Sequence, residues 1–68
     1  MSTYTERLVI EHEALADKTQ KLNNFLHSDK AQALLDEDIA RLKIQYSCME
    51  AYLKVLVLRM DKLGLINE

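Results

Sequence analysis

The sequence is poor in residues that break helices and in residues that cross-link a small protein. It has no proline, no tryptophan, one glycine and one cysteine among 68 residues. A single cysteine excludes an internal disulfide. The scarcity of proline and glycine, together with many Leu, Ala, Lys and acidic residues, is typical of long helices rather than of sheets. We therefore predict an all-α chain.

Long hydrophobic runs are also missing. The longest uninterrupted apolar run, Val55 to Leu58, is far below the roughly 20 residues that span a bilayer. Leu8 to Ile10 is too short for the core of a signal peptide. We expect no membrane association and a location in the cytoplasm where the protein is made. The net charge of −2 is too small to favour binding of extended nucleic acid.

The chain is short for a self-sufficient core. A domain of this size buries only roughly 60% of the surface that its unfolded chain exposes, so it is marginal unless it is cross-linked or oligomeric. His12 and His27 lie about 22 Å apart along one predicted helix, too far to share an ion. We therefore predict no metal site and no cofactor, and we expect self-association to supply the missing stability.

Local signals predict where the first helix begins and ends. Thr3 and Glu6 have the spacing of a capping box, which predicts a helix over residues 4–27. Residues 28–35 then form a connection. Within it, residues 30–35 are either a separate turn or the start of the next helix.

A second helix is predicted over residues 36–63. Acidic residues favour its start, and Gly64 suits its end, with Leu65 able to fold back on Met60 in a Schellman-type cap. A short connection makes two long helices antiparallel neighbours, so residues whose numbers sum to about 62 should face one another. Residues 1–68 are thus predicted to form a single domain, a coiled-coil-like helical hairpin.

The second helix carries a complete coiled-coil seam. Counted in heptads from Ile39, its a and d positions are apolar through four repeats: Ile39, Leu42, Tyr46, Met49, Leu53, Leu56, Met60 and Leu63. The first helix has leucine at its d positions but polar residues at three of its a positions, namely Thr5, His12 and Thr19. The pairing within one chain therefore uses one face of each helix.

The second helix also carries an apolar stripe on its other side. A helix that is apolar nearly all round is normally buried all round, which one neighbouring helix cannot achieve. We therefore predict that this stripe is an interface between copies of the chain. Its residues are Ile44, Cys48, Ala51, Val55, Leu58 and Leu65.

One edge of the hairpin is the candidate ligand site. In an antiparallel pair the g positions of both helices flank each other, which places Tyr4 and Glu11 along the same edge as Tyr52 and Arg59. Tyrosine rings stack on bases and basic side chains hold phosphates. The predicted ligand-binding residues are Tyr4, Arg7, Tyr52, Lys54 and Arg59. The alternative is an ordinary helix edge with amphipathic tyrosine and basic side chains that bind nothing.

Charge is unevenly distributed along the second helix. Asp36, Glu37 and Asp38 stand at its start, whereas Arg59 and Lys62 stand near its end. This pattern complements the helix dipole. The alternative interpretation of the basic end is an anion site.

No arrangement of residues suggests catalysis. A metalloprotease helix needs a second histidine four residues after His12, and position 16 is alanine. Cys48 lacks a base at helical spacing, so we interpret it as a small hydrophobic residue. The only glycine ends a helix, which excludes a phosphate-binding loop. We predict that the protein is not an enzyme.

The spacing of several residues resembles a known family. Residues 6 to about 60 carry the pattern Glu6, Arg7, Leu8, Glu11, Leu15, Lys18, Lys21, Leu22, Phe25, Leu26, Leu42, Gln45, Met49, Tyr52, Leu53, Leu56 and Arg59. This pattern is similar to the small phage-encoded helical family first labelled from a crAss-like phage genome. The resemblance implies a phage or prophage gene.

The sequence is compatible with two functions. Short helical phage proteins of similar size and architecture include the anti-CBASS and anti-Thoeris sponges, which sequester cyclic nucleotide immune signals. By that analogy we expect a homo-oligomer that binds a cyclic oligonucleotide or a ligand of the cyclic ADP-ribose type and counteracts host defence. The alternative is an adaptor or inhibitor that docks a host protein through the apolar face of the second helix.

Overall fold

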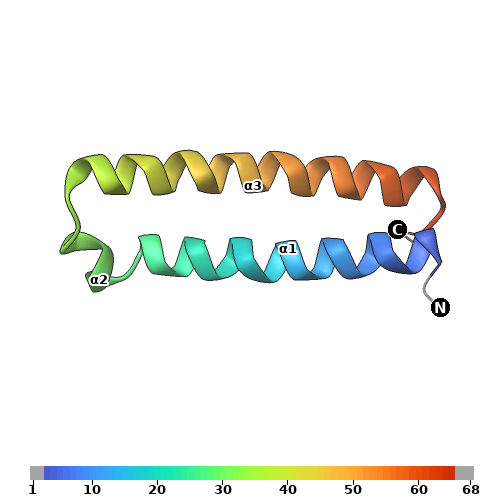
Figure 1. The fold of residues 1–68 in the computed structure, drawn as a ribbon, viewed down its shortest axis with the longest axis horizontal. Helices are drawn as coiled ribbons and strands as arrows, with labels where there is room; N and C mark the ends of the chain where they lie inside the picture. The colour runs from blue at the N-terminus through green and yellow to red at the C-terminus, as the bar shows by residue number, and fades with distance from the viewer. Residues whose placement is uncertain (1–2, 66–68) are drawn as a thin grey trace.

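The computed structural model describes residues 3–65 and confirms a helical hairpin (Figure 1). Helix α1 spans Tyr4–Leu26, α2 is a single turn over Asp29–Gln32, and α3 spans Asp36–Lys62. Helices α1 and α3 run antiparallel, and α2 lies at the opposite end from the start of α1 (Figure 1). The molecule is a rod of 43 × 21 × 21 Å. The predicted domain of residues 1–68 extends beyond the described residues at both ends.

Side chains form hydrogen bonds with the backbone at both ends of α1. The Thr3 hydroxyl accepts a hydrogen bond of 3.1 Å from the backbone N–H of Glu6, so α1 begins at Tyr4. At the other end, the Ser28 hydroxyl donates to the carbonyl of Phe25 over 2.6 Å. Ser28 occupies the N-cap position of α2 but makes no side-chain capping bond to it. Its hydroxyl therefore satisfies the end of α1 rather than the start of α2.

Helix α3 ends in a Schellman motif. Gly64 has a φ of 74°, and the N–H of Leu65 donates to the carbonyl of Met60 over 2.9 Å. This reversal packs Leu65 against the internal core. The prediction that the seam continues to Leu63 is wrong, because α3 stops at Lys62 and Leu63 is left 47% exposed. Leu65 covers the end of the core instead.

The internal core is small and lies toward the end of the rod where α1 begins. Leu8, Leu56 and Met60 are buried there, and Leu56 is completely inaccessible. The polar residue Thr19 is also buried, and its hydroxyl donates to the carbonyl of Leu15 over 2.7 Å. That local bond satisfies the hydroxyl, so a polar seam position is tolerated without a partner on α3. The rest of the seam on α3 up to Leu53 is only half-buried.

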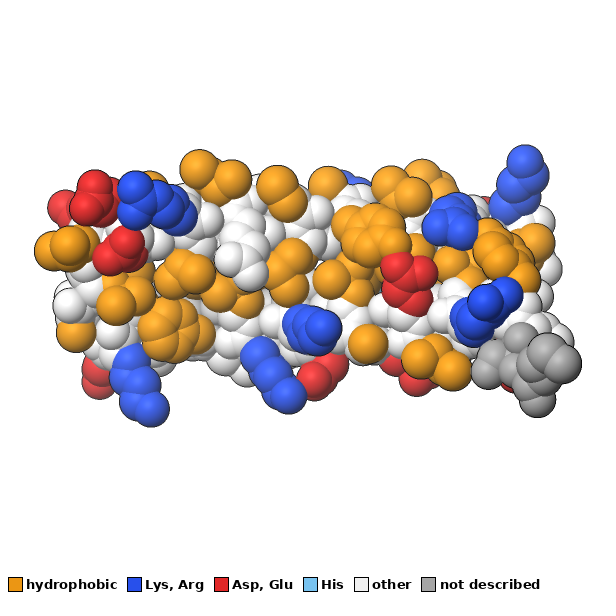
Figure 2. Space-filling view, viewed as in Figure 1, with side chains coloured by type: hydrophobic (Ala, Val, Ile, Leu, Met, Phe, Trp, Pro, Cys, Tyr) orange, Lys and Arg blue, Asp and Glu red, His pale blue; other side chains and the backbone are white. Residues whose placement is uncertain are grey.

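The face of α3 that points away from α1 is apolar and uncovered. Ile44, Val55 and Leu58 are 64%, 47% and 67% exposed. Hydrophobic side chains run along the middle of α3, and charged side chains gather toward its two ends (Figure 2). Nevertheless, within residues 3–65 no helix is both long and apolar enough to cross a membrane.

Candidate ligand-binding edge

Four side chains meet along one edge of the hairpin, two from each long helix. The Tyr52 hydroxyl on α3 donates a hydrogen bond to a carboxylate oxygen of Glu11 on α1. About two turns further along α3, Arg59 donates from Nη2 to the Tyr4 hydroxyl, and its Cζ lies 5.7 Å from the centre of the Tyr4 ring. Both pairs fit the antiparallel register in which residue numbers sum to about 62. We call this group the tyrosine edge.

The tyrosine edge has two chemically different ends. At one end, the hydrogen bond that Arg59 donates to the Tyr4 hydroxyl raises the pKa of Arg59, so the guanidinium stays charged. At the other end, Glu11 supplies a carboxylate that accepts from Tyr52. The edge therefore offers a cation and an aromatic face beside Tyr4, and a hydrogen-bond acceptor beside Tyr52.

The hydrogen bond to Glu11 also raises the pKa of Tyr52, assisted by desolvation and by the negative charge of Glu11, while Arg59 opposes the shift. A raised pKa in the folded state means that this interaction stabilises the fold below the ordinary tyrosine pKa of about 10. The stabilisation is lost as the pH rises through the folded-state value. Glu11 was not among the predicted ligand-binding residues, although its g position lies on this edge.

This assignment predicts a change in tyrosine titration. Replacing Glu11 by Gln removes the charge and the strongest acceptor, so the NMR titration midpoint of the Tyr52 ring should move to lower pH. Tyr46 is the internal control, because its raised pKa comes from desolvation and from Glu50. A shift of Tyr46 instead of Tyr52 would contradict the contact.

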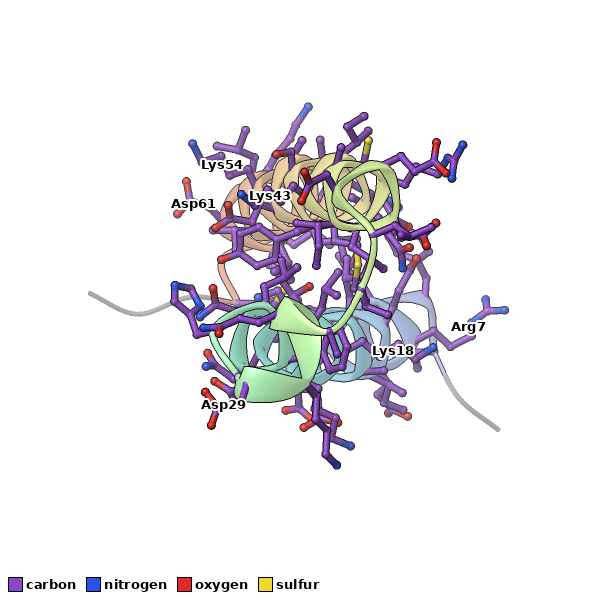
Figure 3. All side chains as sticks on the ribbon, turned by 90° about the vertical axis from the view of Figure 1, so that its left-hand side faces the viewer. Arg7, Lys18, Asp29, Lys43, Lys54 and Asp61 are labelled. Carbon is purple, nitrogen blue, oxygen red and sulfur yellow. The ribbon has the colours of Figure 1, made fainter. Side chains whose placement is uncertain are left out.

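The five predicted ligand-binding residues do not all come together. Tyr4, Tyr52 and Arg59 share the tyrosine edge. Lys54 lies on the opposite side of the rod, whereas Arg7 points outward on the same side as Lys18 (Figure 3). Lys54 follows Tyr52 by two residues, which is a rotation of about 200° around a helix with 3.6 residues per turn. Lys54 therefore lies outside the tyrosine edge.

Lys54 instead borders an open groove between the two long helices. The groove has a volume of about 680 Å³. It is lined by His12, Ala16, Ser47, Glu50, Ala51, Leu53, Lys54, Val57 and Leu58. The pattern of apolar and polar residues did not predict this groove, whose lining includes the short side chains of Ala16 and Ser47 from different helices. His12, a candidate seam residue, forms part of its wall.

The predicted interface residues divide into two sets. Ile44, Cys48, Ala51, Val55 and Leu58 are exposed along the uncovered face of α3. Leu65 differs, because it is half-buried against Leu8, Leu56 and Met60 of its own chain. In residues 3–65, moreover, no three His, Cys, Asp or Glu side chains gather in a group that could hold a metal ion.

The fold and the edge define a class of protein: a helical hairpin with a small internal core, an uncovered apolar face and an edge that mixes tyrosine with arginine. Comparison with family models gives the family. The Sequestin model matches residues 2–62, so the chain belongs to the Sequestin family. No curated protein and no solved structure matches the chain.

Proposed function

We propose that the protein is a non-enzymatic, oligomeric binding protein that sequesters a cyclic nucleotide immune signal. The observation that carries the proposal is the match to the Sequestin family over residues 2–62, since the family name points to sequestration. The tyrosine edge supports it with side chains suited to a nucleotide. We further propose that the gene is phage-encoded and that the protein acts in the host cytoplasm against a defence pathway.

The two ends of the tyrosine edge suggest how a nucleotide is held. A phosphate binds Arg59, where charge-assisted hydrogen bonds to a guanidinium are strong. The ring of Tyr4 or Tyr52 stacks on a base. Glu11 repels phosphate and accepts instead from a base amine or a ribose hydroxyl. A ligand with bases and phosphates joined in a small ring offers both groups at short spacing, whereas an extended strand is not required.

Ligand binding is predicted to raise the melting temperature. Cyclic dinucleotides, cyclic trinucleotides and cyclic ADP-ribose isomers are each added at micromolar concentration in a thermal-shift assay. A ligand present at 100 times its dissociation constant stabilises the folded state by about 2.7 kcal/mol, a shift that such an assay resolves easily. If no member of the panel stabilises the chain, the proposed ligand class is wrong.

Two basic residues give a matched pair of variants for the same assay. Arg59→Gln removes the cation of the tyrosine edge and should abolish the ligand-induced shift. Lys54→Gln removes the same charge on the opposite side of the rod and should leave the shift intact. Equal loss in both variants would indicate a non-specific electrostatic effect.

The second candidate function is an adaptor that docks a host protein. The uncovered apolar face of α3 favours it, because an exposed apolar patch marks an interaction surface. The mass of the purified protein discriminates the two. A single chain in solution leaves this face free for a host protein, whereas an assembly that covers the face favours the sequestering oligomer.

A further inference from the structure

The uncovered face of α3 is symmetric enough to fit a copy of itself. Its apolar residues surround a centre of small side chains, Cys48 and Ala51, with the larger Ile44 and Val55 on either side. Small central residues allow two helix axes to approach closely, and the larger residues then close the ends of the contact. A two-fold interface uses the same surface on both copies, which this pattern satisfies.

Charge selects the direction in which two α3 helices pair. The first turn of α3 carries Asp36, Glu37 and Asp38, and its last turn carries Arg59 and Lys62. A parallel pair would place acid beside acid and base beside base. An antiparallel pair places each acidic end beside a basic end, where opposite charges attract and like charges are separated.

We infer that α3 packs antiparallel against α3 of a second copy, with the two-fold axis passing between Met49 and Glu50. In this register the helices overlap along their full length, and heptad layers pair Cys48 with the partner's Ala51 and Ile44 with the partner's Val55. Glu37 then lies opposite the partner's Lys62, and Asp38 lies beside the partner's Arg59. Leu58 packs on the aliphatic stem of the partner's Arg41.

This pairing extends the tyrosine edge across two chains. Tyr52 and Gln45 occupy the same side of α3, at g positions one heptad apart. In the antiparallel register the partner's Gln45 comes beside Tyr52, and the partner's Asp38 comes beside Arg59. The second copy therefore adds an amide and a carboxylate to each edge, so that a ligand on this surface touches both chains. The inference rests on the self-association in the proposed function, but its test needs no ligand.

Engineered cysteines test the register directly. In a Cys48→Ala background, one chain carries Ile44→Cys and a co-expressed chain carries Val55→Cys. In the proposed register, position 44 of one chain lies directly opposite position 55 of the other, so the two Cβ atoms are within disulfide range. Mild oxidation should therefore link one chain of each kind. Each single-cysteine chain expressed alone should remain unlinked, because equivalent positions in two copies are about 16 Å apart along the axis at 1.5 Å per residue. Mass spectrometry identifies the mixed dimer.

The control replaces Ile44→Cys with Lys43→Cys in the same background. Lys43 points to another side of α3, so it should give no disulfide with Val55→Cys. Linkage of Ile44→Cys to itself would show a parallel pair and overturn the inference. An assembly of several chains without mixed linkage would also overturn it, while leaving the proposed sequestering oligomer standing. All altered positions are exposed within the chain, so the variants should keep the hairpin.

Discussion

Replacing Ile44 by Asp is expected to separate the assembly into single chains. Ile44 is 64% exposed in the hairpin, so the change costs little within one chain. At an interface between copies it buries a carboxylate without a partner, which costs about 3 kcal/mol or more. The dissociation constant should rise by at least about 100-fold. Light scattering at a fixed protein concentration measures the change in mass.

The matched control for Ile44→Asp is Lys43→Asp. It introduces the same side chain at the neighbouring position and alters the net charge more, yet it points away from the apolar face. Its mass should stay that of the unaltered protein. If Ile44→Asp leaves the mass unchanged as well, the apolar face is not the contact between copies.

Leu56→Ala is expected to cause the largest loss of stability within the hairpin. Leu56 is the most completely buried side chain among residues 3–65, and it contacts the small cluster formed with Leu8 and Met60. Truncating a buried leucine to alanine costs about 2–5 kcal/mol through lost burial and the cavity left behind. For a chain this short, that is a large share of the total stability.

The measurement is thermal or urea unfolding followed by circular dichroism. In a domain of this size a loss of 1 kcal/mol lowers the melting temperature by about 4–8 °C, so Leu56→Ala should lower it by about 8 °C or more. Leu35→Ala is the control, because Leu35 is 65% exposed at the start of α3. It should change the free energy of unfolding by about 0.5 kcal/mol or less. Similar losses for both variants would contradict the assigned core.

The helix ends were predictable because short-range rules decide them. The Thr3 cap depends on one hydroxyl and an amide three residues away, and both are visible in the sequence. The Gly64 reversal likewise depends on a residue that tolerates positive φ. The heptad count was wrong at Leu63, because a heptad pattern does not indicate the residue at which a helix ends. The reversal moved Leu65 into the place that the count had given to Leu63.

The pairing of the two long helices was predictable only in part. An antiparallel hairpin fixes which residues share a height along the axis, and it correctly placed Tyr4 near Arg59. Height alone does not say which side of a helix a residue occupies. Height alone places Lys54 near Tyr52, whereas helical rotation puts it on the opposite side.

The groove beside His12 could not be predicted from the pattern of apolar and polar residues. Its lining includes short side chains from both long helices, among them Ala16 on α1 and Ser47 on α3. Such a hollow depends on the exact distance and rotation of two helices, which a heptad pattern fixes only to within a class of packing angles. Tertiary geometry was needed to see it.

The most direct test of a sequestering oligomer is native mass spectrometry of the protein with and without cyclic nucleotides. We expect a mass of two or more chains, an added mass equal to whole numbers of ligand, and loss of that added mass in Arg59→Gln but not in Lys54→Gln. A single chain that retains no cyclic nucleotide at micromolar concentration would contradict it.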